Sequence, residues 1–210
     1  TWTRAQITGI SNTAGSGSGN PNETLINTTT GSSVNVTYVY TVFANGCANP
    51  VTFNVIVTVY PTPKLSSNVT PPPICSGVTF TYLPTSGTAG ATYTWSRAPV
   101  VGISNTVGSG AGDPNETLFD TTTAPVNVTY VYTVSANGCT NTTTYNVIVT
   151  VNPTPTLTST LTPPAICSGT ILNYTPTSAT SGAAFVWNRA PVTGINQAPA
   201  SGTENPNEML

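Results

Sequence analysis

The segment VNVTYVYTV, which runs from Val126 to Val134, decides the fold because its side chains alternate with a period of two. One face carries only Val and Tyr, and the other carries Asn, Thr and a single Val. This alternation is typical of a half-buried β-strand. A second alternating run spans Tyr145–Val151, and the hairpin signal Asn137-Gly138 lies between the two runs. We therefore predict two adjacent antiparallel strands.

Shorter runs predict further strands ahead of this hairpin. They lie at Val78–Tyr82, around Tyr93 and Trp95, and at Thr117–Thr122. The Gly/Ser/Asn-rich stretch Gly102–Pro114 is predicted to be a flexible loop, and no window has the period of a helix. We expect an all-β fold, an immunoglobulin-like sandwich with a Trp on its third strand.

The pattern repeats along the chain with a period of about 92 residues. The strings TWTRA, TWSRA and VWNRA place tryptophans at Trp2, Trp95 and Trp187, which are 93 and 92 residues apart. NVTYVYTV, NGC and ICSG each occur twice at nearly the same spacing. A period of this length suits a complete small β-domain rather than a solenoid unit.

Pro-Thr-Pro segments beginning at Pro61 and Pro153 mark the predicted boundaries, because proline makes short, stiff, extended linkers. Residues 61–152 are then one whole repeat. Residues 1–60 are the C-terminal part of the repeat before it, and residues 153–210 are the N-terminal part of the repeat after it. We expect further repeats to flank the chain on both sides.

The composition excludes several classes of function. Charged residues make up 5% of the chain, against roughly 25% in an ordinary soluble domain. A net charge of −2 argues against a nucleic-acid-binding patch and a polybasic membrane surface, and we expect no membrane insertion. The absence of His removes the commonest general base and metal ligand.

Four cysteines in a protein of this kind indicate an oxidising, extracellular setting. They are Cys47, Cys75, Cys139 and Cys167. The expected strand order puts Cys75 and Cys139 at opposite ends of one sandwich, too far apart for a disulfide. We favour bridges between neighbouring repeats, in which case no pair forms within these 210 residues. An intra-repeat Cys75–Cys139 bridge is the alternative.

Charged and aromatic residues recur with the repeat. Each repeat has an Arg and a Glu 19 residues apart, and we predict structural ion pairs that each pin a loop: Arg4 with Glu23, Arg97 with Glu116 and Arg189 with Glu208. A ligand-binding Arg is the alternative. Trp2, Trp95 and Trp187 are predicted to fill the core, with a sugar-stacking platform as the alternative.

We expect no catalytic site, metal site or cofactor. No nucleophile can pair with a His, and the cysteine spacing is not that of a zinc knuckle. The one acidic cluster comprises Asp113, Glu116 and Asp120. In the first repeat only one of these three positions is acidic, at Glu23, which argues against a calcium site. The motifs GSGSG and GSGAG lack the context of a phosphate-binding loop.

The chain resembles the PKD-like and Ig-like tandem repeats of giant surface proteins in Bacteroidota. The resemblance covers essentially the whole chain, and the residues that carry it in the complete repeat are Ile74–Gly77, Tyr93–Trp95, Asn115–Leu118, Val126–Val134, Asn137–Cys139 and Val149–Pro155. The chain is also similar to the SprB-type gliding-motility adhesins, which are exported by type IX secretion. The resemblance implies an adhesin stalk at the cell surface. Asp120-Thr121-Thr122 also resembles an O-glycan acceptor motif of that phylum, which would make Thr121 the modified residue.

These observations favour a structural role. We expect rigid tandem domains, each roughly 35–45 Å long, that form a filament carrying adhesion. Their partners would be neighbouring repeats of the same chain, with surface polysaccharide or abiotic surfaces as further candidates. A polysaccharide-binding module and an accessory linker of a carbohydrate-active enzyme are the alternatives. Buried aromatic side chains would favour the spacer, and an exposed row of them would favour the binding module.

Overall fold

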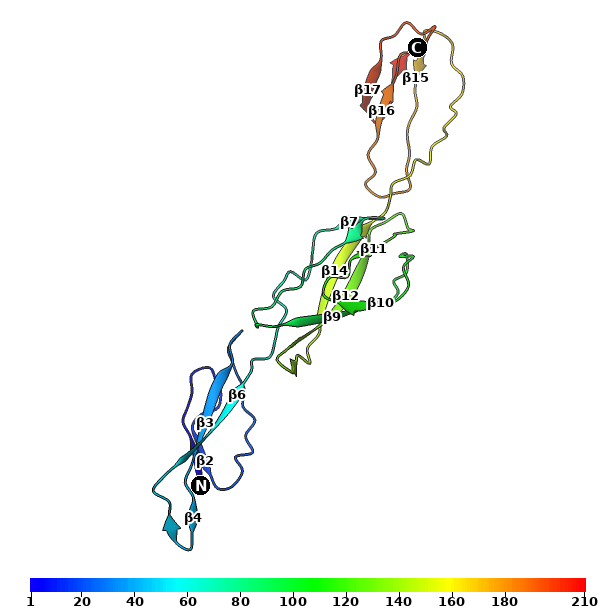
Figure 1. The fold of residues 1–210 in the computed structure, drawn as a ribbon. Helices are drawn as coiled ribbons and strands as arrows, with labels where there is room; N and C mark the ends of the chain where they lie inside the picture. The colour runs from blue at the N-terminus through cyan, green and yellow to red at the C-terminus, as the bar shows by residue number, and fades with distance from the viewer.

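The computed structural model describes residues 1–210 and contains strands but no helix. Three units follow one another along a single axis, with the two termini at opposite ends (Figure 1). We call them the first unit (residues 1–60), the middle unit (61–152) and the third unit (153–210). The chain is an all-β protein, as predicted, and it has no helix that could cross a membrane.

The first unit is built on one antiparallel sheet with the order β2-β1-β3-β6. A separate two-stranded ribbon, β4 with β5, extends beyond it. The strands are β1 (Trp2–Arg4), β2 (Gly15–Gly17), β3 (Val34–Tyr40), β4 (Phe43–Ala44), β5 (Cys47–Ala48) and β6 (Phe53–Val59).

The middle unit has two layers. Its main sheet has the order β10-β9-β12-β14-β7, in which only β7 runs parallel to its neighbour, and β8 and β11 form a small second sheet. The strands are β7 (Ile74–Cys75), β8 (Thr79–Phe80), β9 (Thr92–Arg97), β10 (Gly108–Ala111), β11 (Glu116–Thr117), β12 (Val126–Ala136), β13 (Cys139–Thr140) and β14 (Tyr145–Asn152).

The predicted hairpin is confirmed. Strands β12 and β14 pair antiparallel from Val126 opposite Val151 to Tyr132 opposite Tyr145. At the tip of the hairpin, Asn137 and Gly138 have φ angles of 52° and 78°. Both values lie in the left-handed region that Asn and Gly tolerate best, which explains why this dipeptide makes the turn.

The core of the middle unit lies between the two layers. The alternating Val and Tyr side chains from Val128 to Val134 in β12 and from Val147 to Val151 in β14 are fully buried on one face. They pack against Phe80 and Leu118 of the second layer and against Trp95 of β9. The period-two pattern therefore predicted the core face correctly.

The third unit has two separate strand pairs, β15 with β18 and β16 with β17. The strands are β15 (Ile171–Leu172), β16 (Val186–Arg189), β17 (Ala200–Thr203) and β18 (Glu208–Met209). Their registers match those of β8 with β11 and of β9 with β10, so this unit reproduces the N-terminal half of the middle unit.

Three details of the sequence prediction were wrong. The predicted strand Val78–Tyr82 is only Thr79–Phe80, because the Tyr82 N–H donates to the Asp113 side chain (2.7 Å) instead of to a neighbouring strand. The predicted strand Thr117–Thr122 shortens to β11 and one isolated bridge at Asp120. The predicted loop Gly102–Pro114 contains a real strand, β10, which pairs with β9.

Equivalent loops meet at both junctions between the units. At the first junction the Thr88 hydroxyl donates to the Thr30 carbonyl (3.0 Å), and at the second the Ser181 N–H donates to the Thr123 carbonyl (3.0 Å). Thr88 is only 3% exposed. Pro61 is buried, and the carbonyl of Pro63 accepts a hydrogen bond from Asn141 (2.9 Å). The linker is thus packed against the units that it joins.

Candidate functional site

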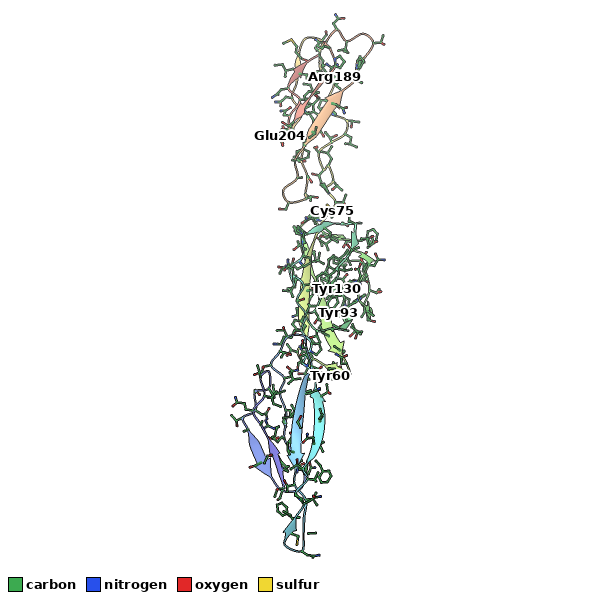
Figure 2. All side chains as sticks on the ribbon, turned by 60° about the vertical axis from the view of Figure 1, so that its left-hand side comes forward. Tyr60, Cys75, Tyr93, Tyr130, Arg189 and Glu204 are labelled. Atoms are coloured by element: carbon green, nitrogen blue, oxygen red, sulfur yellow. The ribbon has the colours of Figure 1, made fainter.

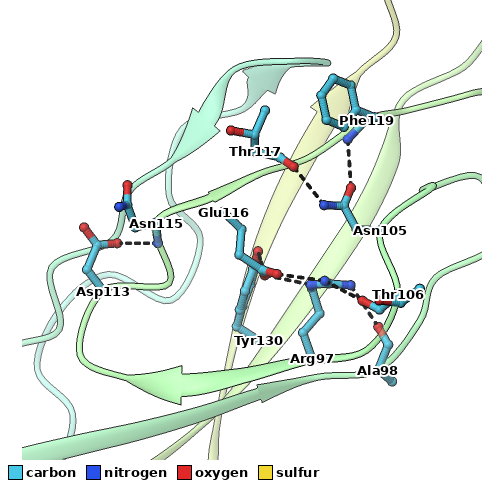
Figure 3. A network of polar contacts seen from close by, with 10 residues as sticks. All are labelled: Arg97, Ala98, Asn105, Thr106, Asp113, Asn115, Glu116, Thr117, Phe119 and Tyr130. Atoms are coloured by element: carbon cyan, nitrogen blue, oxygen red, sulfur yellow. Dashed lines mark hydrogen bonds and ion pairs between the residues drawn. The ribbon is translucent and has the colours of Figure 1, made fainter.

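The most elaborate polar site of the middle unit surrounds Arg97, which ends β9 and is 1% exposed (Figure 3). Its Nε donates to Glu116 Oε2 (2.8 Å) and its Nη2 to Glu116 Oε1 (2.9 Å), which makes a bidentate ion pair. Nη2 also donates to the Thr106 carbonyl (2.7 Å). One arginine therefore fixes both the loop that precedes β10 and strand β11.

A tyrosine completes this site. The Tyr130 hydroxyl, from β12, donates to Glu116 Oε2 (2.7 Å), and the Arg97 guanidinium carbon lies 6.0 Å from the centre of the Tyr130 ring. The predicted pair is thus part of a triad that ties three strands together. Sequence reasoning missed Tyr130. The available signal was its place on the core face of β12, where a half-buried carboxylate can accept a second donor.

The electrostatics of the triad favour its charged form. Hydrogen bonds from Arg97 lower the pKa of Glu116, and the hydrogen bond from Tyr130 acts in the same direction. Burial, helped by the neighbouring carboxylate, raises the pKa of Tyr130, so its hydroxyl remains a donor. Hydrogen bonding to Glu116 raises the pKa of Arg97.

The first unit repeats this arrangement closely. Arg4 Nη2 lies 2.7 Å from Glu23 Oε1, and the Tyr38 hydroxyl donates to Glu23 Oε2 (2.7 Å). Here the Arg4 hydrogen bond lowers the pKa of Glu23 to about 2. In the third unit Arg189 lies 3.0 Å from Glu208, but no tyrosine hydroxyl bonds that carboxylate.

The tryptophans lie directly beneath the glycine strands. Trp2 and Trp95 are 6% and 7% exposed, and Trp187 is half-buried. A Cβ on Gly110 would lie 2.9 Å from the Trp95 ring, and one on Gly108 would lie 2.8 Å from Glu116 Oε1. Glycine at alternate positions of β10 thus lets the indole and the ion pair approach the backbone. This spacing was the unused signal for the missed strand.

Residues 72–155 match the PKD-like domain family. The match contains the Arg97 triad, Trp95 and both long strands of the hairpin. No curated protein and no solved structure matches the chain. The triad of the middle unit is enclosed, since Arg97 offers almost no surface to a ligand, and its geometry suits a structural role.

The three acids of the middle unit do not converge. Asp113 accepts hydrogen bonds from the N–H groups of Tyr82 and Asn115, whereas Glu116 bonds Arg97. Asp120 accepts bonds from the N–H and hydroxyl of Thr122 (both 2.8 Å). No group of three or more metal-ligating side chains comes together anywhere in the structure.

Asp120 is the least satisfied of these acids. It is 9% exposed, and its Oδ2 has no hydrogen-bond partner. At the corresponding place in the first unit stands Asn27, whose Nδ2 donates to the carbonyls of Val59 (2.7 Å) and Ser32 (2.9 Å). The carboxylate therefore replaces a donor with an acceptor.

The four cysteines are free. Cys75 lies at the end of the middle unit that faces the third unit (Figure 2), and it pairs with Asn152 at the end of β14. Cys139 pairs with Ala136 at the hairpin tip, the opposite end of the same sheet. The structure therefore has no Cys75–Cys139 bridge. Disulfide bridges between repeats stay a prediction. Each cysteine would then pair with a cysteine of a repeat outside residues 1–210.

Thr121, which is the predicted O-glycan acceptor, is exposed on the middle unit. Its hydroxyl donates to the Gly102 carbonyl (3.1 Å). Modification of this hydroxyl stays a prediction.

Proposed function

We propose that the chain consists of structural repeats from the stalk of a secreted cell-surface adhesin. The observation that carries this proposal is the end-to-end arrangement of three similar units along one axis (Figure 1). Packed linkers and recurring loop contacts at both junctions support a spacer that keeps its direction.

The aromatic side chains of the middle unit favour this spacer over a polysaccharide-binding module. A module that stacks sugars needs aromatic rings on an open face. In the middle unit Trp95 and most of the Tyr and Phe side chains are buried or half-buried, and Phe119 is the one exposed aromatic residue. A single ring is a poor platform for an extended polysaccharide.

The finer parts of the proposal follow the resemblance to surface repeats. We place the chain outside the cell, in an adhesin filament of the gliding-motility type exported by type IX secretion, with a non-catalytic role. Its partners are the neighbouring repeats, and the adhesin as a whole would attach to surface polysaccharide or abiotic surfaces. The low charge and the four cysteines agree with an oxidising exterior.

Pulling single molecules by their two ends tests the mechanical role. Unfolding the middle unit of about 92 residues should release about 27 nm of chain, from extended length minus folded length. We expect a distinct force peak with that increment in length. Glu116→Gln should lower the unfolding force of this peak, because it removes the ion pair with Arg97. Glu204→Gln, at an exposed residue, should leave the unfolding force unchanged. Extension without a peak would overturn the proposal. Polysaccharide binding that Phe119→Ala abolishes would favour the binding module.

A further inference from the structure

The unpartnered carboxylate oxygen of Asp120 can be placed by comparison with the first unit, because Asp120 and Asn27 hold equivalent positions. Asn27 Oδ1 accepts a hydrogen bond from the Thr29 N–H (2.8 Å), and Asp120 Oδ1 accepts one from the Thr122 N–H (2.8 Å). Both residues also form the corresponding isolated β-bridge. Asp120 Oδ2 therefore occupies the position that Nδ2 of Asn27 has in the first unit.

The groups around this position are main-chain carbonyls. Asn27 Nδ2 donates to the carbonyls of Val59 (2.7 Å) and Ser32 (2.9 Å). The strand registers make Val151 the counterpart of Val59. Ala124 is the counterpart of Ser32, since the equivalent threonine hydroxyl donates to each carbonyl (2.7 and 2.6 Å). The unpartnered carboxylate oxygen thus faces the carbonyl oxygens of Val151 and Ala124.

No donor and no positive side chain of this chain balances these oxygens. An asparagine brings two N–H donors to its two carbonyls, whereas a carboxylate brings none. Asp120 is 9% exposed and forms no salt bridge. The three arginines are each paired with a glutamate, and Lys64 lies in the linker of the first junction. Buried charges in proteins are paired or coordinate a metal ion, so this carboxylate calls for a cation.

We propose that Asp120 Oδ2 and the carbonyl oxygens of Ala124 and Val151 bind a calcium ion. Ca²⁺ is a hard cation that takes carboxylate and main-chain carbonyl oxygens together with water. A single carboxylate predicts a weak site, with a dissociation constant of about 10⁻⁴–10⁻³ M, as in extracellular modules. Because two of its ligands are main-chain oxygens, the pattern of acidic side chains does not predict this site. The expectation of no metal site rested on that pattern.

The calcium ion would join the end of the main sheet to the loop at the second junction. Val151 lies near the end of β14, and Ala124 follows Thr123, whose carbonyl accepts the Ser181 N–H of the third unit (3.0 Å). The ion would thus hold the loop that contacts the next unit. In the first unit Asn27 holds the equivalent loop through its two hydrogen bonds, so only the second junction would depend on calcium.

Isothermal titration calorimetry of the intact chain with CaCl₂ tests the proposal. One ion should bind per chain, and Asp120→Asn should weaken binding by about tenfold or more, because it removes the only charged ligand. This variant should fold, since asparagine occupies the same place in the first unit. Without calcium it should even be the more stable form, because its amide supplies the missing donors. Absence of saturable binding up to about 10 mM CaCl₂, or equal binding by Asp120→Asn, would overturn the proposal.

Two further variants serve as matched controls. Glu204→Gln removes an exposed acid that lies in no ion pair, and it should leave the calcium affinity unchanged. Equal loss in Glu204→Gln and Asp120→Asn would overturn the proposal. Asn27→Asp places a carboxylate before the carbonyls of Val59 and Ser32, so it should create a second calcium site. A variant that still binds a single ion would refute this choice of ligands. The pulling experiment does not depend on calcium, so the two proposals fail separately.

Discussion

At the scale of single residues, the three arginines of this chain form ion pairs inside the units. The Arg97 side chain is enclosed, and its charge is neutralised by a bidentate carboxylate with a tyrosine as second donor. A buried ion pair is weak evidence for stability in itself, but removal of one partner leaves the other charge buried without a counter-ion. The triad therefore makes folding sensitive to each of its three members.

Glu116→Gln should destabilise the middle unit by about 2–4 kcal/mol, since Arg97 would keep its charge and lose its counter-ion. Thermal unfolding followed by circular dichroism measures the effect. Glu204→Gln is the control, because Glu204 is exposed and lies in no ion pair.

The effect should depend on pH with a definite sign. The pKa of Glu116 in the folded state is lowered from its ordinary 4.5, so its contribution is complete above that value and is lost as the pH falls. The difference between parent and Glu116→Gln should therefore shrink in acid. A constant difference from pH 7 to pH 2 would contradict the assigned ion pair.

Asp120→Asn should stabilise the middle unit by about 1 kcal/mol, because an amide can donate where the unpartnered Oδ2 now lies. The expected acceptor is the Val151 carbonyl, which corresponds to the Val59 carbonyl beside Asn27. Denaturant unfolding measures the change in midpoint. The reciprocal Asn27→Asp should destabilise the first unit, and stabilisation there would refute the explanation.

At the scale of elements, strand β10 shows how glycine at alternate positions lets a sheet edge pack closely on a large ring. Its glycines bring the backbone onto the indole of Trp95, so the ring packs against main chain instead of against Cβ atoms. The same arrangement recurs with Trp2 and Gly17 and with Trp187 and Gly202.

Gly110→Ala should therefore destabilise the middle unit by about 1–3 kcal/mol, because the new Cβ would lie 2.9 Å from the ring. Tryptophan fluorescence and thermal unfolding report the displacement. Ser109→Ala, at the neighbouring exposed position, should change neither. Equal stability of both variants would show that the ring is free to move.

The elements that the sequence predicted are those whose side chains alternate. The hairpin of β12 and β14 combines period-two patterning with an Asn-Gly turn, and both signals depend on local chemistry. Strand β10 was missed because glycine has no side chain to show a period. The role of Tyr130 was missed because alternation assigns a residue to a face without identifying its hydrogen-bond partner. The 19-residue recurrence of Arg and Glu did indicate which charges meet.

At the scale of the whole molecule, the junctions determine its shape. At the first junction Gly31 lies against the Gly87 carbonyl so closely that a Cβ on Gly31 could not fit. Thr30 and Thr88 form a hydrogen bond beside this contact. The units are thus joined by a specific contact as well as by the linker.

Gly31→Ala should loosen this junction without unfolding the units. Small-angle X-ray scattering should show a smaller and broader distribution of maximum dimensions, because the first unit would bend relative to the middle unit. Ser33→Ala, at an exposed position of the same loop, is the control. An unchanged scattering curve would mean that the linker alone keeps the units aligned.

The enclosure of the arginines has a consequence for the resistance of the chain to proteases. Trypsin-like proteases require an accessible Lys or Arg, and this chain has four Lys and Arg residues in all. Arg4, Arg97 and Arg189 are held by carboxylates, which leaves exposed Lys64 as the accessible cleavage point. Brief digestion of the native protein should release residues 1–64 and 65–210, and Lys64→Gln should prevent it. A chain that holds its arginines in ion pairs offers trypsin-like proteases very few places to cut.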